Sequence, residues 1–131
     1  MDSSSIILYN GEGEILLQER EKDIEFYPGI FGLFGGSVEN GESHLECISR
    51  EIMEELGYKL RNPGFFAKKR INGNFNYIYS ERYDASQKLI LGEGASMQWA
   101  RKELIETLDM VPFQKEAIYE FISSGKLNSR I

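Results

Sequence analysis

The stretch from Gly36 to Tyr58 reads GSVENGESHLECISREIMEELGY, and most of what the sequence predicts starts from it. Its first part is a glycine-containing loop, and the remainder has the features of a helix. Ser43 and Glu46 form the capping-box pattern S-x-x-E, in which the two side chains satisfy free backbone N–H groups at a helix start. Gly57 suits the left-handed residue that commonly ends a helix. The stretch therefore predicts a turn that leads into a well-delimited helix.

The helix predicted over residues 43–56 is amphipathic. Its apolar residues recur at spacings of three and four, which at about 100° per residue places them on one narrow stripe. We expect this stripe to face the protein core. Its members are Leu45, Ile48, Ile52 and Leu56.

Carboxylates crowd another face of the same helix. Glu51, Glu54 and Glu55 stand at positions i, i+3 and i+4, so their repulsion costs roughly a few tenths of a kcal/mol per pair. Arg50 neutralises one of these charges. A divalent cation such as Mg²⁺ or Mn²⁺ would neutralise the rest, because carboxylate oxygens are its preferred ligands. For the helix taken by itself, a solvated acidic face is the alternative.

The net charge of the chain is concentrated in this region. The 131 residues carry a formal charge of −6, and residues 39–55 contribute −5 of it through six acidic side chains and one arginine. An acidic protein is a poor binder of bulk nucleic acid. A small phosphorylated ligand is still compatible with this charge if metal ions hold it. The length fits one domain over residues 1–131.

Composition excludes several classes of protein. Cys47 and His44 are each the only residue of their type, which excludes an intrachain disulfide, a cysteine-based zinc cluster and a multi-histidine metal site. The first residues lack the charged and apolar regions of a signal peptide. No apolar run approaches the roughly 18 residues of a membrane span. We expect a soluble protein of the cytoplasm.

The rest of the chain alternates between strand and helix patterns. Asn72-Gly73 is a strong hairpin signal, and Pro112 suits the first turn of a last helix. Residues 22–42 read as loop with a short strand near Leu33. The order of elements indicates an α/β or α+β sandwich. We expect strands over residues 5–9, 14–20, 64–71, 74–83 and 97–100, and helices over residues 102–108 and 112–123.

The opening stretch resembles a family motif. It reads Gly36-x5-Glu42-x7-Arg50-Glu51-Ile52-x-Glu54-Glu55-x-Gly57-Tyr58, and the Nudix box is G-x5-E-x7-R-E-U-x-E-E-x-G-U, where U is a bulky aliphatic residue. Every position matches except the last, where a tyrosine stands. The chain is identified as a member of the Nudix hydrolase superfamily, similar to its MutT-like proteins. The resemblance implies an α/β/α sandwich around a mixed β-sheet, with Gly57 in a structural role.

The resemblance also implies an activity. Its members hydrolyse a diphosphate linked to another group, often a nucleoside diphosphate derivative, with Mg²⁺ or alternatively Mn²⁺ as cofactor. Position in the motif makes Glu51 and Glu55 the leading metal ligands, followed by Glu54, with the carbonyl oxygen of Gly35 as a further ligand. Metal ions held there would polarise phosphoryl oxygens and lower the pKa of a bound water.

Supporting roles follow from the same comparison. Arg50 would orient Glu51 through a charge-assisted hydrogen bond, and Glu42 would steady the junction of loop and helix through Arg50. Glu51 and Glu93 are rival candidates for the general base. Glu93 is also a candidate metal ligand, and a polar turn residue is its alternative.

Substrate contacts are expected at Arg20 and Gly36, and Gln114 is compared with a further position. Arg20 matches an arginine that contacts substrate phosphate in some relatives, and a surface arginine at a strand end is the alternative. Gly36 allows the loop backbone to approach a ligand closely. Gln114 falls near a base-reading asparagine of MutT-like proteins.

The expected partner is a small, nucleotide-like phosphorylated molecule, with no membrane and no bulk nucleic acid. Monomer and homodimer are both open. A Nudix-fold binding or sensor module without turnover is a second reading, against which the intact box argues. An isomerase acting on isopentenyl diphosphate is a third, for which the chain is short and Cys47 lies on the box helix. The loops that would select the substrate carry no decisive signature.

Overall fold

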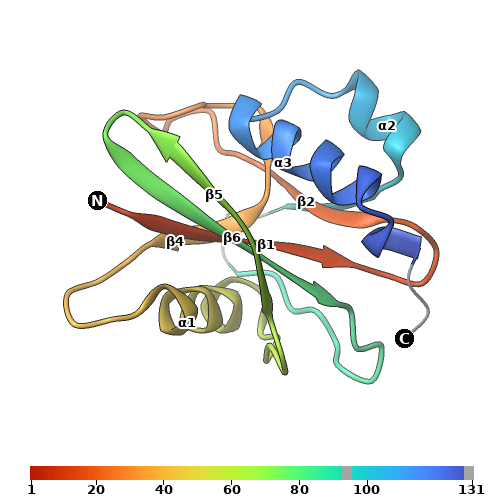
Figure 1. The fold of residues 1–131 in the computed structure, drawn as a ribbon, viewed down its shortest axis with the longest axis horizontal. Coiled ribbons are helices and arrows are strands. Elements are labelled where there is room, and N and C mark those ends of the chain that lie inside the picture. Colours follow the sequence, from red (N-terminus) through yellow and green to blue (C-terminus); the bar gives the residue numbers. More distant parts are fainter. Residues whose placement is uncertain (93–95, 129–131) are drawn as a thin grey trace.

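The computed structural model describes residues 1–92 and 96–128. In these residues seven strands form one mixed sheet, with α1 on one face and α2 and α3 on the other (Figure 1). This α/β/α sandwich is the architecture that the sequence predicted. The strands are β1 (Ser3–Tyr9), β2 (Ile15–Glu19), β3 (Phe31–Gly32), β4 (Phe34–Ser37), β5 (Gly64–Ile71), β6 (Asn74–Arg82) and β7 (Met97–Ala100). The helices are α1 (His44–Leu56), α2 (Lys102–Thr107), α3 (Pro112–Ser123) and the short 3₁₀ helix η1 (Lys126–Asn128).

Strand β1 is central because it pairs with three other strands. It runs parallel to β6 along its whole length and antiparallel to β4 along its first half. Its last residue, Tyr9, pairs with Ile15 of β2. Strand β5 pairs antiparallel with β6, and β2 pairs antiparallel with β3 and β7. Since β4 takes the place of β2 beside the first half of β1, the glycines of β4 lie against the start of β1.

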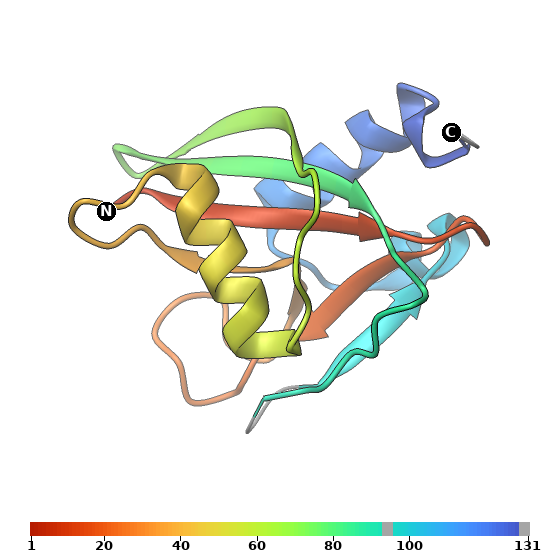
Figure 2. The same cartoon turned by 90° about the horizontal axis from the view of Figure 1, so that it is seen from below.

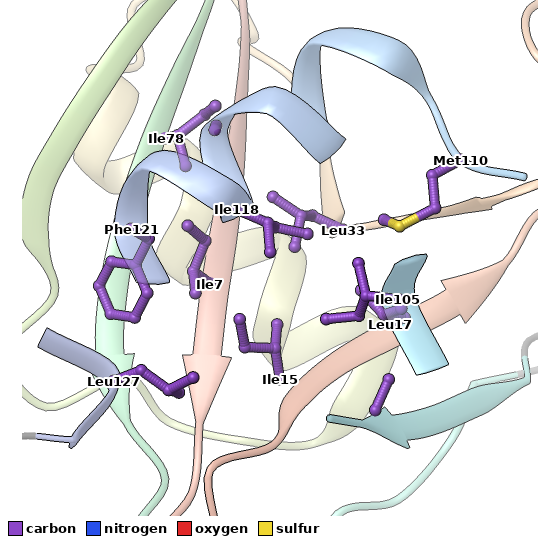
Figure 3. Packing of buried hydrophobic residues seen from close by; sticks show 12 residues of the cluster. Ile7, Ile15, Leu17, Leu33, Ile78, Ile105, Met110, Ile118, Phe121 and Leu127 are labelled. Carbon is purple, nitrogen blue, oxygen red and sulfur yellow. The ribbon is translucent and has the colours of Figure 1, made fainter. Parts of the chain in front are cut away.

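The two faces of the sheet carry separate apolar cores. Ile7 points into the core under α3, whereas Ile6 and Leu8 point into the core under α1, as the alternation of a strand requires. Both faces of β1 are therefore buried, which explains its continuous apolar run. Figure 3 shows the α3 side, where Ile118 and Phe121 belong to the same cluster as Ile7.

Helix α1 begins and ends where the sequence predicted. The Ser43 hydroxyl accepts a hydrogen bond from the Glu46 N–H at 3.0 Å, and the Glu46 carboxylate accepts one from the Ser43 N–H at 2.8 Å. Gly57, at φ 59°, ends the helix and its N–H donates to the Met53 carbonyl at 3.0 Å. The helix lies across β1 and β4 (Figure 2), so it carries its side chains to the glycines of β4.

The predicted apolar stripe of α1 is wrong at one position. Leu45 is 45% exposed, whereas the other three members are buried. Cys47 is fully buried instead, and its thiol donates to the Gly36 carbonyl at 3.5 Å. In the first turn of α1, Cys47 faces β4. Leu45 therefore lies on the side that faces solvent.

Removing the capping box should destabilise the fold without touching the carboxylates. We expect Ser43→Ala to lower the free energy of unfolding by about 1 kcal/mol, because the N–H of Glu46 loses its acceptor. Denaturant unfolding measures the change. Ser49→Ala, in the middle of the same helix, is the matched control and should have almost no effect. Equal values for the two variants would contradict a capping role for Ser43.

The remaining elements are confirmed with small shifts of their ends. Asn72 and Gly73 have positive φ, at 49° and 83°, as a type I′ hairpin turn requires. Residues 22–42 contain two short strands, β3 and β4, where the sequence predicted one near Leu33. Among the described residues, no helix is long and apolar enough to cross a membrane.

Candidate active site

Arg50 organises the carboxylates at the start and on the exposed side of α1. Its guanidinium binds Glu42 in a bidentate manner, with Nε to Oε2 at 2.7 Å and Nη2 to Oε1 at 3.1 Å. Its Nη1 donates to Glu51 Oε1 at 3.0 Å and to Glu54 Oε2 at 3.3 Å. Nη2 also donates to the Ser37 carbonyl at 3.3 Å. Arg50 therefore joins β4, the loop and α1, and it holds Glu51 in one orientation.

The same contacts shift the pKa values of Glu42 and Arg50. The hydrogen bonds from Arg50 lower the pKa of Glu42 from 4.5 to about 2, and those to Glu42 and Glu51 raise the pKa of Arg50. Glu42 also accepts a hydrogen bond from the Glu39 N–H at 3.0 Å, which closes the turn before the helix. These contacts are those expected if Glu42 steadies the junction of loop and helix.

The Glu42 ion pair should make the fold sensitive to acid. Because the pKa of Glu42 is lowered on folding, its contribution to stability is complete above about pH 4.5 and is lost as the pH falls toward 2. We expect the melting temperature of the wild-type protein to fall more steeply over that range than that of Glu42→Gln. Thermal unfolding at matched pH values measures both slopes. Parallel curves would contradict the pairing.

The surroundings of Glu55 disfavour the ionised form of its carboxyl group. Burial raises its pKa, and a hydrogen bond shared with Glu51 and repulsion from Glu51 and Glu54 raise it further. The positive charge of Arg20 acts in the opposite direction. Three carboxyl groups thus lie close together with too little positive charge to neutralise them.

Two adjacent glycines of β4 leave room for different neighbours. A side chain at Gly36 would overlap the carboxylate of Glu51. The Glu51 carboxylate therefore packs against the backbone of β4 at this glycine. A side chain at Gly35 would overlap the backbone carbonyl of Ser4 on β1, so that glycine allows the two strands to approach. Gly36 therefore makes room for the Glu51 side chain, whereas Gly35 makes room for the neighbouring strand β1.

Arg20 directly follows β2, lines a pocket and lies near Glu55. Its Nε donates to the Tyr27 carbonyl at 3.2 Å and its Nη2 to the Phe26 carbonyl at 3.0 Å. Burial lowers the pKa of Arg20, and the nearby Glu55 opposes that shift. The pocket has a volume of about 470 Å³ and is lined by Arg20 together with β4 residues that include Gly35 and Gly36.

The loop after β6 completes the end of α1. The Ile90 N–H donates to the Leu56 carbonyl at 2.7 Å, and the Gly92 N–H donates to the Glu55 carbonyl at 2.8 Å. Two carbonyls at the helix end are thereby satisfied. Glu93, the rival candidate for the general base, lies outside the described residues.

A ready-made metal site is absent from residues 1–92 and 96–128. No group of three or more His, Cys, Asp or Glu side chains there is arranged to hold an ion. Arg50 instead pairs with two of the three carboxylates, Glu51 at 3.0 Å and Glu54 at 3.3 Å.

Most residues that line the pocket were not predicted from the sequence. Asn76 of β6 and Ser5 of β1 are buried polar residues that line it, and neither carries a motif. Gln114 lines it as well, and its Oε1 accepts a hydrogen bond from the Leu33 N–H at 2.8 Å. One signal could have identified Asn76 and Ser5. Each is a polar residue that lies two positions before a buried apolar residue of the same strand, and so on the same face of the sheet.

Comparison with known proteins places the chain in a family. A model of the NUDIX domain matches residues 1–121. The chain belongs to the Nudix hydrolase family. An uncharacterized Nudix hydrolase of Pseudomonas aeruginosa is 32% identical over 119 residues, which cover 86% of this chain and 70% of that protein. A nucleoside triphosphatase, NudI, of an Enterobacter species is 29% identical over 79% of this chain and 84% of its own length.

Solved structures agree on the fold of this Nudix hydrolase. A structure from a study of MutT from Aliivibrio salmonicida and Vibrio cholerae superimposes with a TM-score of 0.76 at 21% identity, covering 91% of this chain and 97% of the other. Several curated relatives are matched over less than half of their own length. The comparisons therefore establish the family and the fold.

Proposed function

We propose that this Nudix hydrolase cleaves the diphosphate linkage of a small nucleotide derivative, with Mg²⁺ or alternatively Mn²⁺ held by Glu51, Glu54 and Glu55. The observation that carries the proposal is the crowding of these three carboxyl groups: Arg50 binds Glu51 and Glu54, and Glu55 shares a hydrogen bond with Glu51, next to a pocket that is lined by the glycines of β4. The relative NudI, a nucleoside triphosphatase, supports the nucleotide part of the proposal.

The residues present fit a divalent cation. The raised pKa of Glu55 reflects burial and the repulsion of two neighbouring carboxyl groups, and a cation would relieve that repulsion. Glu54 is the exposed member and is free to turn away from Arg50, whose other contacts would keep Glu51 in place. The carbonyl oxygen of Gly35 is a further proposed ligand. A bound cation would polarise the phosphoryl oxygens and make hydroxide available near neutral pH.

The chain's own groups then have distinct tasks. Arg50 is a positioning residue, since it holds Glu51 through a charge-assisted hydrogen bond while Glu42 anchors its other edge. Either Glu51 or Glu93 would accept the proton of the attacking water. Arg20, which lines the pocket and lies near Glu55, would bind a phosphate, and Gly36 would let the β4 backbone approach the substrate.

Proton transfer can be assigned with a pair of variants. If Glu93 is the base, Glu93→Gln should lower kcat strongly and leave the affinity for Mn²⁺ nearly unchanged. If Glu51 is the base as well as a ligand, Glu51→Gln should lower both. Steady-state kinetics and a metal titration on the two variants separate these results.

A panel of candidate substrates tests the function itself. Nucleoside triphosphates, oxidised nucleotides, nucleotide sugars, ADP-ribose, dinucleoside polyphosphates and capped RNA are incubated with Mg²⁺ and with Mn²⁺, and phosphate is read after coupling to a phosphatase. We expect metal-dependent release from at least one of them. Binding without release at any metal concentration would favour the second candidate, a sensor module without turnover.

A further inference from the structure

The face of the sheet that carries α1 is left open along β5. Among the described helices, α1 packs on β1 and β4, and none lies over β5 on this side (Figure 2). Strand β5 pairs with β6 alone among the described strands, so it is also an edge of the sheet. Phe65 of β5 points to this face, where its ring contacts Tyr79, and it is 55% exposed. A large aromatic side chain is therefore presented to solvent beside α1.

Three aromatic residues form a row on this face, which we call the ring row: Phe65, Tyr77 and Phe75. The ring centre of Tyr77 lies 6.3 Å from that of Phe65 and 6.5 Å from that of Phe75. Tyr77 also stacks on His44 of α1 at 3.4 Å, with 17° between the two planes. Phe75 borders the pocket described above, whereas Phe65 and Tyr77 do not line it. The ring row is thus a surface largely separate from that pocket.

Two cations lie among these rings. In the pairing of β5 with β6, Lys68 stands opposite Tyr77 and Arg70 opposite Phe75, which places both on the face of the ring row. Lys68 Nζ is 4.1 Å from the ring centre of Phe75 and 5.4 Å from that of Tyr77. Both cationic side chains belong to exposed residues. Rings and cations interleaved in this way can contact a planar group and an anion at the same time.

The carboxylates of the chain do not cancel this charge. Glu51 packs against β4, which β1 and β6 separate from β5. Two glutamates of α3 bind Lys69, whose side chain lies on the opposite face of β5. Asp2 does reach the ring row: it accepts a hydrogen bond from the Phe75 N–H at 3.0 Å and lies 3.9 Å from His44. The two cations outnumber this one carboxylate beside the rings.

The charges argue against a second copy of the chain as the occupant. The edge strand β5 carries Lys68, Lys69 and Arg70 in succession, and charged side chains on an edge hinder pairing with another strand. A two-fold contact between ring rows would bring the cations of both copies into one interface, where burying them without partners is costly. A polyanion with flat rings has the complementary charge and shape.

We propose that this surface binds single-stranded nucleic acid, with bases stacked on the ring row from Phe65 inward and backbone phosphates paired with Lys68 and Arg70. A single strand suits it better than a duplex, because the bases of a duplex are already stacked on one another. Binding at the ring row needs neither metal nor hydrolysis, so it stands or falls separately from the proposed function.

An oligouridylate of about eight nucleotides, with a 5′ hydroxyl group and a 3′ fluorescein, is the probe. It has no diphosphate, and EDTA in the buffer prevents metal ions from bridging it to the carboxylates. Fluorescence anisotropy follows binding between about 20 and 200 mM salt. We expect a dissociation constant between about 10⁻⁴ and 10⁻⁶ M at the lowest salt, and a slope of log K against log salt of about −1.4 for two phosphate contacts.

Variants assign the binding to the ring row. Phe65→Ala should weaken it about tenfold, because a stacking surface is lost. Lys68→Gln should reduce the magnitude of the salt slope by about 0.7. Two matched controls should bind as the wild-type protein does: Phe26→Ala, at an exposed phenylalanine of the pocket, and Lys102→Gln, at an exposed lysine of α2.

Ultraviolet cross-linking of a 5-iodouridine version of the probe to the wild-type protein requires no variant, so it decides the matter even if Phe65→Ala fails to fold. Mass spectrometry should find the cross-links on peptides that contain Phe65 or Tyr77.

Several results would overturn this assignment and leave the proposed function standing. They are a dissociation constant weaker than about 1 mM at the lowest salt, cross-links confined to other segments, and a loss of affinity in Phe26→Ala that Phe65→Ala does not share. Binding to phosphatidylserine vesicles but not to the oligonucleotide would make the ring row a membrane-contacting surface instead. A dimer that Phe65→Ala dissociates, without oligonucleotide binding, would make it a contact between copies.

Discussion

Replacing Glu55 with glutamine is expected to abolish turnover and to leave the fold intact. Glu55 is half-buried, and burial and the neighbouring Glu51 raise its pKa, so the free protein gains little from its charge. A metal ligand, by contrast, supports several kcal/mol of charge stabilisation in the transition state, and its loss should lower kcat by about three orders of magnitude. The melting temperature should be unchanged or higher, because repulsion with Glu51 is relieved.

Steady-state kinetics and thermal unfolding on one preparation measure both effects. Glu51→Gln should show a similar loss of kcat. Glu103→Gln, at an exposed position of α2, is the control and should behave like the wild-type protein. Wild-type activity in Glu55→Gln or in Glu51→Gln would show that the assignment of the carboxylates is wrong.

Alanine at the two glycines of β4 should give opposite outcomes. In Gly36→Ala the added methyl group meets the end of the flexible Glu51 side chain, so the fold should survive while the carboxylate is displaced. Displacement by about 1 Å costs on the order of 100-fold in rate. In Gly35→Ala the methyl group meets the backbone of Ser4, which cannot turn aside, and we expect a loss of about 1–3 kcal/mol in the free energy of unfolding.

Denaturant unfolding and kcat, measured on both glycine variants, separate the two roles. We expect Gly36→Ala to lose more activity than stability and Gly35→Ala to lose stability first. If the two variants lost stability equally and Gly36→Ala kept its specific activity, Glu51 would not depend on that glycine.

The sequence predicted the parts of the molecule that local chemistry dictates. The capping box, Gly57 and the Asn72-Gly73 turn depend on neighbouring residues, and all three are confirmed. Arg50 donates to both Glu42 and Glu51, and the three lie within one loop and helix, so these contacts too are local ones.

Features that depend on contacts between distant segments were harder to predict. Leu45 is exposed because β4 meets the other side of α1, which no local pattern shows. The two strands in residues 22–42 exist because β1 and β2 offer them partners, although glycines have little preference for strands. Asn76 joined the pocket only through the parallel pairing of β6 with β1, 73 residues away from Ser3.

A titration with Mn²⁺, followed by the electron paramagnetic resonance signal of the free ion, tests whether Glu51 and Glu55 hold the metal. The wild-type protein should bind the ion, and the double variant Glu51→Gln/Glu55→Gln should bind it at least about tenfold more weakly, because two carboxylate ligands are gone. Glu103→Gln should bind as the wild-type protein does. Equal affinity in the double variant and the wild-type protein would contradict the claim that these carboxylates hold the metal.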